Sequence, residues 1–129
     1  DYTVRSFSVD EAKAVLRTRP QNLSLDEMFA VAQTYEPGSN DFKQVFDVAV
    51  RMYPDSEVAN LNAACALLEQ ELTEQARPYL DKAGNSPQAD NARGVCLRMQ
   101  GRYDEAVECL RRAADAGLEE AVSNLSGIE

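Results

Sequence analysis

The sequence predicts an all-α fold in which helical hairpins stack side by side, and two observations support this class. Apolar residues recur at the i, i+3, i+4 and i+7 spacing of amphipathic helices along most of the 129-residue chain. Segments of similar design also begin near residues 23, 57 and 87, and such a hairpin buries its apolar face only against neighbours like itself. We therefore expect a lead-in helix, three hairpins and a capping helix, arranged as a right-handed α-α superhelix with a shallow concave side.

The pattern divides the chain into a short N-terminal segment and one repeat domain. Residues 2–7 alternate apolar and polar side chains as a short strand does, so residues 1–8 are expected to be the end of a preceding domain or a linker. The helical repeat domain is expected to cover 9–129, with repeats at about 23–56, 57–86 and 87–118 and a cap at 119–128.

The lead-in helix is expected to begin just after Ser8. Ser8 and Glu11 have the S-x-x-E spacing of a capping box, in which the serine and glutamate side chains satisfy backbone N–H groups at the helix start. The helix is expected to end before Pro20, because the residue that precedes a proline disfavours the α conformation.

The first hairpin begins with a second capping box, formed by Ser24 and Glu27. Its first helix is expected to run to about Tyr35, where a turn cluster rich in Pro, Gly and Ser follows. Its second helix is expected to run from about Asn40 to Tyr53.

The second hairpin carries a proline, Pro78, inside its second helix. Because an internal proline removes a backbone hydrogen bond, this helix is expected to begin nearer Gln75 or to bend there. The connection to the next hairpin is short. Gly84 can end one helix in the left-handed conformation, Ser86 can cap the next, and Pro87 suits its first position.

The third hairpin has small residues on both helices. Gly94 and Ala106 would let the two backbones pack closely, and Gly101 lies in the turn between them. After Gly117 a last short helix is expected to cover the open end of the stack. Its inner face is expected to hold Ala121, Val122 and Leu125, and its outer face Glu119, Glu120, Ser123 and Asn124.

Composition limits the function. The formal net charge is −9, which argues against nucleic acid and against anionic membrane surfaces as partners. No apolar run approaches the ~20 residues of a membrane span, so direct membrane insertion of this segment is not expected. The pattern leaves the oligomeric state open.

The sequence offers no catalytic site, metal site or cofactor site. It has no His, and its three cysteines, Cys65, Cys96 and Cys109, form no CxxC pair and lie inside apolar helical runs, so zinc is improbable. The paired carboxylates, such as Asp104 and Glu105, lie in first turns of expected helices, where acids favour the helix dipole. We therefore expect no enzyme activity.

The third hairpin resembles the tetratricopeptide repeat (TPR), a helical hairpin of 34 residues. The small, large, turn and aromatic positions of that repeat are matched by Gly94, Leu97, Gly101, Tyr103, Ala106, Leu110 and Ala113. Asp90 and Leu118 depart from the pattern, since they stand where the family prefers Trp and Pro. In the first repeat Phe42 stands where the family has Ala, and is expected to hold that hairpin open.

The resemblance implies a non-catalytic scaffold that binds a protein or peptide in its concave groove. The groove positions of the family fall, among others, on Tyr35, Val58, Leu61, Leu68, Asn91, Arg98 and Met99. The Lys, Asn and Arg clamp with which some family members hold a C-terminal carboxylate is not reproduced. One alternative stays open at this point, a purely structural spacer or dimerisation domain of a larger protein.

A narrower resemblance covers most of the chain. It is similar to the C-terminal segment of uncharacterised, OmpA-like or fimbria-associated envelope proteins of Bacteroides-type bacteria, through the runs RPQNLSLDEMFAVAQTY, GSNDF, YPDSEVANLNAA, NARGV and AGLEEAVSNL. This similarity implies a periplasmic or outer-membrane-associated location and a role in envelope or surface-fibre assembly. A cytoplasmic location is the alternative.

Overall fold

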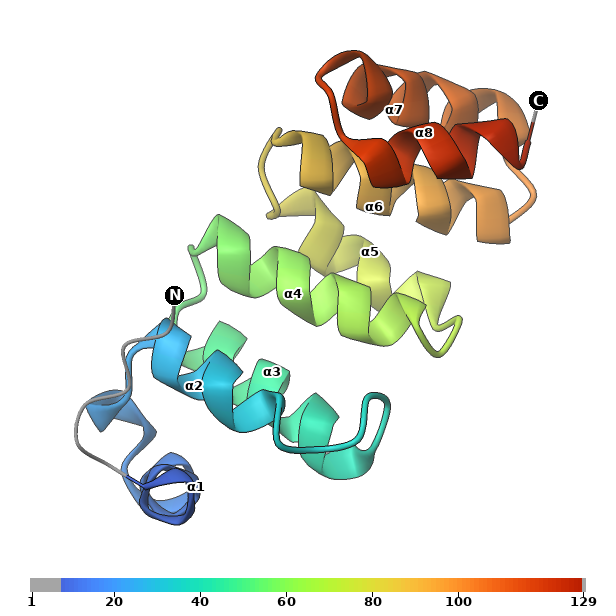
Figure 1. The fold of residues 1–129 in the computed structure, drawn as a ribbon. Helices are drawn as coiled ribbons and strands as arrows, with labels where there is room; N and C mark the ends of the chain where they lie inside the picture. The colour runs from blue at the N-terminus through green and yellow to red at the C-terminus, as the bar shows by residue number, and fades with distance from the viewer. Residues whose placement is uncertain (1–7, 129) are drawn as a thin grey trace.

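The computed structural model describes residues 8–128, and these residues form only helices and the turns between them (Figure 1). The predicted all-α fold of stacked hairpins is confirmed for this part of the chain, whereas the strand expected at 2–7 lies outside the described residues. The elements are α1 (Val9–Thr18), the 3₁₀-helix η1 (Pro20–Asn22), α2 (Leu25–Ala32), α3 (Asn40–Met52), α4 (Glu57–Leu68), α5 (Thr73–Asp81), α6 (Pro87–Met99), α7 (Tyr103–Asp115) and α8 (Glu119–Ser126).

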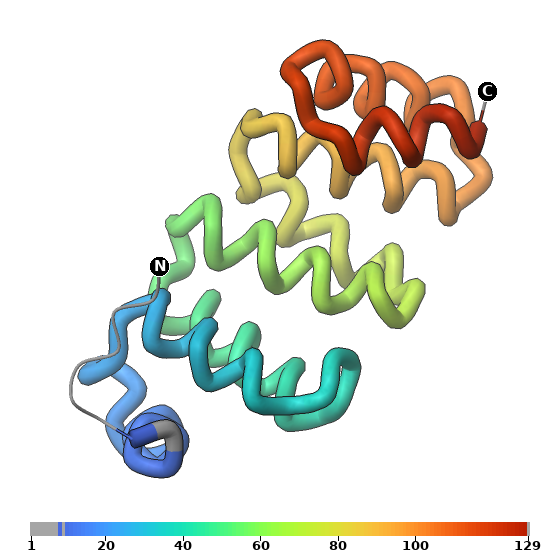
Figure 2. The backbone as a smooth tube through the Cα atoms, in the orientation of Figure 1, coloured from blue at the N-terminus to red at the C-terminus, as the bar shows by residue number. Residues whose placement is uncertain are grey.

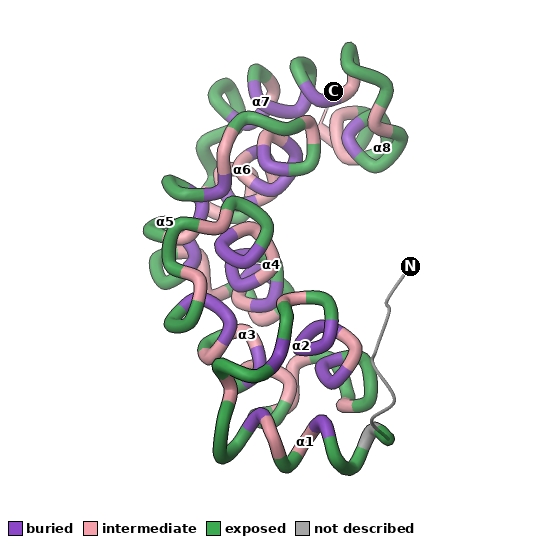
Figure 3. The backbone as a smooth tube through the Cα atoms, turned by 90° about the vertical axis from the view of Figure 1, so that its left-hand side faces the viewer, coloured by how far each residue is buried: buried purple, intermediate pink, exposed green. Residues whose placement is uncertain are grey.

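The helices form three successive hairpins, α2/α3, α4/α5 and α6/α7, and the tube in Figure 2 shows how each hairpin follows the previous one. The lead-in helix α1 crosses the others steeply at one end, and α8 lies at the other end. Figure 3 shows that the stack is curved, with α2, α4, α6 and α8 along its inner side and α3, α5 and α7 along its outer side. The first helix of each hairpin therefore lines the concave face.

Serine residues start most of the hairpin helices. The hydroxyls of Ser24, Ser39, Ser56 and Ser86 each accept a hydrogen bond from the backbone N–H three residues further on. The capping box predicted for the first hairpin is complete, because Glu27 also accepts from the Ser24 backbone N–H at 2.8 Å. Local side-chain chemistry thus fixes where these helices begin.

Two helix boundaries differ from the prediction. Helix α2 ends at Ala32 rather than near Tyr35, because the Thr34 backbone and hydroxyl both donate to the Val31 carbonyl and tighten the chain into a turn. Helix α5 begins at Thr73 rather than near Gln75, whereas the alternative expectation, a bend at Pro78, stays a prediction.

The early start of α5 has a cause in the preceding turn. Glu71 takes a φ of 60°, and the Leu72 N–H then donates to the Leu67 carbonyl, so the chain reverses within a few residues without a glycine. Pro78 consequently lies inside the helix, where its ring is exposed and one backbone hydrogen bond is missing.

The third hairpin is packed as closely as its small residues allow. A Cβ atom placed on Gly94 would lie 2.6 Å from Cγ of Leu110 and 3.3 Å from the Ala106 carbonyl oxygen. Both Ala106 and Leu110 are fully buried. The glycine is therefore required by the approach of α7, and the predicted role of Gly94 and Ala106 is confirmed.

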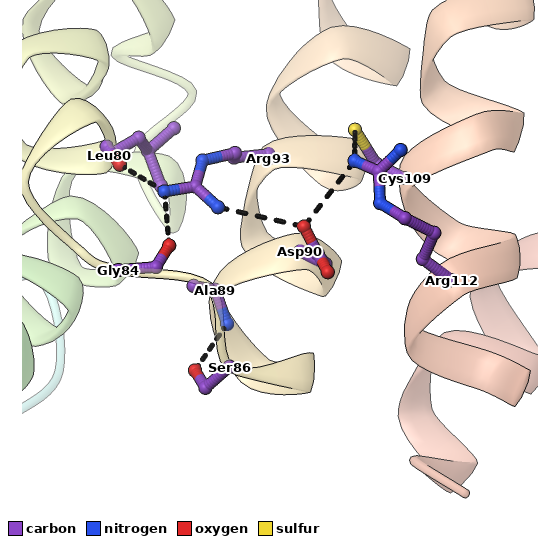
Figure 4. A network of polar contacts seen from close by, with 8 residues as sticks. All are labelled: Leu80, Gly84, Ser86, Ala89, Asp90, Arg93, Cys109 and Arg112. Carbon is purple, nitrogen blue, oxygen red and sulfur yellow. Dashed lines mark hydrogen bonds and ion pairs between the residues drawn. The ribbon is translucent and has the colours of Figure 1, made fainter. Parts of the chain in front are cut away.

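The short connection between α5 and α6 is held by Arg93 (Figure 4). Its guanidinium donates to the Leu80 carbonyl at 2.7 Å and to the Gly84 carbonyl at 2.6 Å, which are backbone acceptors at and beyond the end of α5. Asp90 pairs with Arg93 at 3.6 Å and with Arg112 of α7 at 3.4 Å. Asp90, which departs from the repeat pattern, thus joins Arg112 of α7 to Arg93, and Arg93 in turn contacts the end of α5.

The faces of α8 differ in part from the prediction. Ala121 is buried as expected, but Val122 is 50% exposed, and Asn124 is half-buried. The reason is the position of α8 beside α6, where the Asn124 side-chain amide donates to the Asn91 side-chain oxygen at 3.0 Å. The helix therefore turns Asn124 rather than Val122 toward the rest of the stack.

Candidate functional site

The inner face of the curved stack carries a cavity of about 400 Å³ between α4, α6 and the start of α8. It is lined by Leu61, Asn62, Cys65, Leu68, Glu69, Gln88, Asn91, Ala92, Val95, Met99, Leu118 and Glu120. Its volume lies within the range of about 300–1,000 Å³ that is usual for ligand sites. This cavity is our candidate site.

Helical spacing explains how these side chains come together. On α4, Leu61, Cys65 and Leu68 lie at i, i+4 and i+7 and so share one face. On α6, Asn91 and Val95 lie one turn apart on the face toward α4 and α8. Because α4 and α6 are the first helices of adjacent hairpins, stacking sets their inner faces side by side.

Four of the predicted groove residues line this cavity: Leu61, Leu68, Asn91 and Met99. They do not contribute equally. Leu68 and Asn91 are 5% and 9% exposed and form its floor, whereas Met99 is 40% exposed at its edge. Val58 is 57% exposed in the first turn of α4 and is not part of the lining.

The structure places the other two predicted residues elsewhere. The Tyr35 ring lies beneath the Lys13 ammonium, 4.7 Å from ring centre to Nζ, a distance suited to a cation–π contact. Tyr35 also lines a different cavity, bounded by α1 and α3. The Arg98 guanidinium is directed at the Asn124 carbonyl, 3.5 Å away near the end of α8. Neither side chain reaches the concave cavity.

Sequence reasoning missed four lining residues: Asn62, Ala92, Leu118 and Glu120. The last two come from the turn after α7 and from α8, a helix that the sequence predicted only as a cover for the end of the stack. The available signal was Leu118 itself, an apolar residue directly after Gly117, at a position where the repeat pattern prefers proline.

The electrostatics of the cavity act on Cys65. This residue is exposed, yet the cavity walls remove enough water from its sulfur to raise the pKa of the Cys65 thiol to about 11. Burial is the largest cause, and the negative charges of Glu69 and Glu120 raise this pKa further. The thiol is therefore protonated at neutral pH and is a poor nucleophile.

Little in the described part of the chain indicates covalent chemistry. Burial also raises the pKa of the Cys96 thiol, whose sulfur lies 3.8 Å from the Thr73 carbonyl oxygen. Residues 8–128 contain no group of three or more His, Cys, Asp or Glu side chains that could hold a metal ion. What the site offers is an apolar floor with polar edges, an arrangement suited to binding.

A family comparison finds a repeat pattern in the third hairpin. Residues 91–116 match the tetratricopeptide repeat model, and the match covers most of α6, all of α7 and the first residue after α7. Proteins that carry this repeat commonly use it for protein–protein interaction. A search of curated proteins gave no match to the chain. Among the described helices, none is long and apolar enough to cross a membrane.

Proposed function

We propose that this chain is a non-catalytic interaction scaffold that holds a protein or peptide partner in the concave cavity between α4, α6 and α8. The observation that carries the proposal is the convergence of Leu61, Leu68, Asn91 and Met99, from two separate hairpins, on one cavity of about 400 Å³. The repeat match at residues 91–116 supports the same kind of function.

The cellular role proposed for the scaffold is bacterial cell-envelope or fimbria-related assembly, in the periplasm or at the outer membrane. Support for this part comes from the sequence similarity to envelope proteins, carried by runs such as YPDSEVANLNAA and AGLEEAVSNL. A net charge of −9 fits a partner that is basic or neutral rather than acidic.

Site-specific photo-crosslinking in the full-length protein tests the scaffold proposal. A photoreactive residue at Met99, at the edge of the cavity, is expected to capture one defined partner from native envelope preparations. The matched control carries the same residue at Tyr103, which is 56% exposed and lies outside the cavity lining. Equal capture from both positions, or none from Met99, would reject the concave cavity as the site.

A second candidate function is a purely structural spacer or dimerisation domain. It is favoured by Val122, which is 50% exposed on the outermost helix α8 and presents an apolar side chain to solvent. Sedimentation across a concentration series distinguishes the two functions. Dimers that dissociate in a Val122→Asp variant, together with no capture at Met99, would favour the structural function.

A further inference from the structure

The concave cavity has a charge pattern of one sign. Its floor and walls are apolar or neutral, and the charged side chains that line it are Glu69, at the end of α4, and Glu120, in the first turn of α8. No Lys or Arg is among its lining residues. Arg98, the one basic residue among the predicted groove positions, is directed at the Asn124 carbonyl instead.

Both carboxylates are available to a ligand. Neither Glu69 nor Glu120 takes part in an ion pair within residues 8–128, whereas Glu105 pairs with Arg102 at 2.6 Å and Asp90 pairs with two arginines. A carboxylate with no cationic partner gains from one, because the Coulomb attraction adds to the free energy of binding where the cavity walls exclude part of the water.

The thiol of Cys65 shows that the two carboxylates act on the same space. Glu69 and Glu120 both disfavour the thiolate of Cys65, so a negative potential from the two helices overlaps at the cavity wall. The same potential that disfavours an anion there favours a cation. Cys65 is also a built-in reporter of whether the cavity is occupied.

Two other cavities lack this character. The cavity between α3, α4 and α5, of about 490 Å³, is lined by one Lys and one Asp, and its Lys43 donates to Gln70 at 3.1 Å. A smaller cavity of about 150 Å³ is lined by Arg77, Arg93 and Arg102, but each of these arginines already has an internal carboxylate or carbonyl partner. Two carboxylates with no Lys or Arg beside them in the lining therefore distinguish the concave cavity from these two.

We propose that the concave cavity binds a basic-apolar peptide segment, in which a side chain such as Leu or Met enters the apolar floor and a neighbouring Lys or Arg reaches Glu69 or Glu120. This inference rests on the proposed scaffold function and names the chemistry of its partner. It requires the reverse of a carboxylate clamp, since the protein supplies the anions and the partner the cations. A volume of about 400 Å³ suits a short segment rather than a whole helix.

Defined peptides test the inference on the unaltered protein. The probe is an acetylated and amidated peptide that alternates Leu and Lys among Ser spacers, so that its termini carry no charge. Two matched peptides replace every Lys by Glu or every Leu by Ser. Titration calorimetry is expected to show binding of the Leu–Lys peptide, weakened by added salt, and at least about tenfold weaker binding of both matched peptides.

Protection of Cys65 from a maleimide locates the site. The measurement uses a variant in which the buried Cys96 and Cys109 are replaced by Ala, so that Cys65 is the thiol that is labelled. The Leu–Lys peptide is expected to slow this labelling. A Glu69→Gln, Glu120→Gln variant is expected to bind this peptide about three- to tenfold more weakly. The control variant, Glu36→Gln with Glu108→Gln, makes the same change in net charge at exposed positions outside the cavity lining and is expected to bind like the wild type.

The outcomes separate the two proposals. If the Leu–Glu peptide binds as tightly as the Leu–Lys peptide and also protects Cys65, the cavity is a binding site but the charge preference is wrong. If the Leu–Lys peptide binds without protecting Cys65, or binds the control variant as weakly as the cavity variant, the attraction is one of overall charge and the inference fails. If no peptide binds and Met99 captures no partner, the scaffold function itself fails.

Discussion

The first and third hairpins solve the same packing problem with side chains of opposite size. Between α2 and α3, aromatic rings fill the space, with the Phe29 and Phe46 centroids 5.9 Å apart and Phe42 meeting Phe46 edge-on at 4.9 Å. Between α6 and α7, a Cβ at Gly94 would lie 2.6 Å from the Leu110 side chain, so the backbones themselves approach. The topology is the same, but the contents of the interface are not.

This difference shows that the repeat pattern describes one way of packing a helical hairpin. The distance between packed helices depends on the side chains at their contact, so a small-residue pattern describes one spacing rather than the hairpin in general. The tetratricopeptide repeat model matches residues 91–116, where the small residues occur. Aromatic packing keeps the hairpin in the first repeat while the pattern is lost. A hairpin can therefore keep the same topology in this chain without carrying the sequence pattern by which the repeat is recognised.

The largest effect is expected from removing an aromatic ring from the interface between α2 and α3. Phe29 is 6% exposed, and Phe29→Ala is expected to lower the free energy of unfolding by about 3–5 kcal/mol, because no neighbour can fill the space of a ring. Urea unfolding followed by circular dichroism measures this change. Tyr103→Ala, at a residue that is 56% exposed, serves as the control and is expected to change stability by less than about 0.5 kcal/mol. A loss below 1 kcal/mol for Phe29→Ala would mean that the rings do not set the first interface.

The opposite change tests the close-packed hairpin. Gly94→Val is expected to cost about 2–3 kcal/mol of unfolding free energy, because the new side chain meets Leu110 and the Ala106 carbonyl. The corresponding change in α2, Ala30→Val, is expected to cost less than about 1 kcal/mol, since Ala30 is half-buried.

A double-mutant cycle identifies the contact responsible. Leu110→Ala leaves a cavity, but it also removes the group that would clash with the valine introduced at position 94. The double variant is therefore expected to lose less unfolding free energy than the two single variants together. Strict additivity would contradict the geometry, as would a Gly94→Val protein that unfolds like the wild type.

Residues whose effect is local were predictable from sequence. The capping box at Ser24, the serine cap at Ser86 and the left-handed Gly84 depend on backbone geometry within a few residues, and each lies where it was expected. Gly94 was also predictable, because a glycine in mid-helix opposite an alanine indicates close approach. Periodicity and small-residue spacing were thus sufficient for the stacked all-α fold.

Features that depend on distant neighbours were not predictable in the same way. Val122 is exposed and Asn124 half-buried because α8 lies beside α6, and a helical wheel of α8 alone cannot contain that contact. Tyr35 and Arg98 fall on groove positions of the repeat, but Lys13 and the Asn124 carbonyl hold them elsewhere. A binding site built between repeats depends on such contacts.

A smaller loss of stability is expected at Arg93, which holds the connection between the second and third hairpins. Arg93→Met keeps the aliphatic length but leaves the Leu80 and Gly84 carbonyls without this donor, and is expected to cost about 1.5–3 kcal/mol of unfolding free energy. The matched control is Arg51→Met, since Arg51 pairs with Asp47 at 2.9 Å on an exposed helix face and such pairs contribute about 0.3–0.5 kcal/mol. Similar losses in both variants would show that the α5–α6 connection does not depend on Arg93.

The smallest expected effect concerns how the stability of the protein depends on pH through Cys65, which lies on α4 of the second hairpin. Its thiol pKa is raised from 9.0 to about 11 in the folded protein, so the folded state holds this proton more tightly than the unfolded chain does. The resulting stabilisation is present below pH 9 and is lost as the pH rises toward 11, so the unfolding free energy of the wild type should fall more steeply across this interval than that of Cys65→Ala.

The double variant Glu69→Gln, Glu120→Gln should lower the pKa of the Cys65 thiol in the folded protein and speed maleimide labelling of Cys65 at pH 8. The acceleration should stay below about tenfold, because tenfold requires a full pKa unit and burial is the larger cause. Slower labelling in this variant would contradict the placement of both carboxylates beside the cavity.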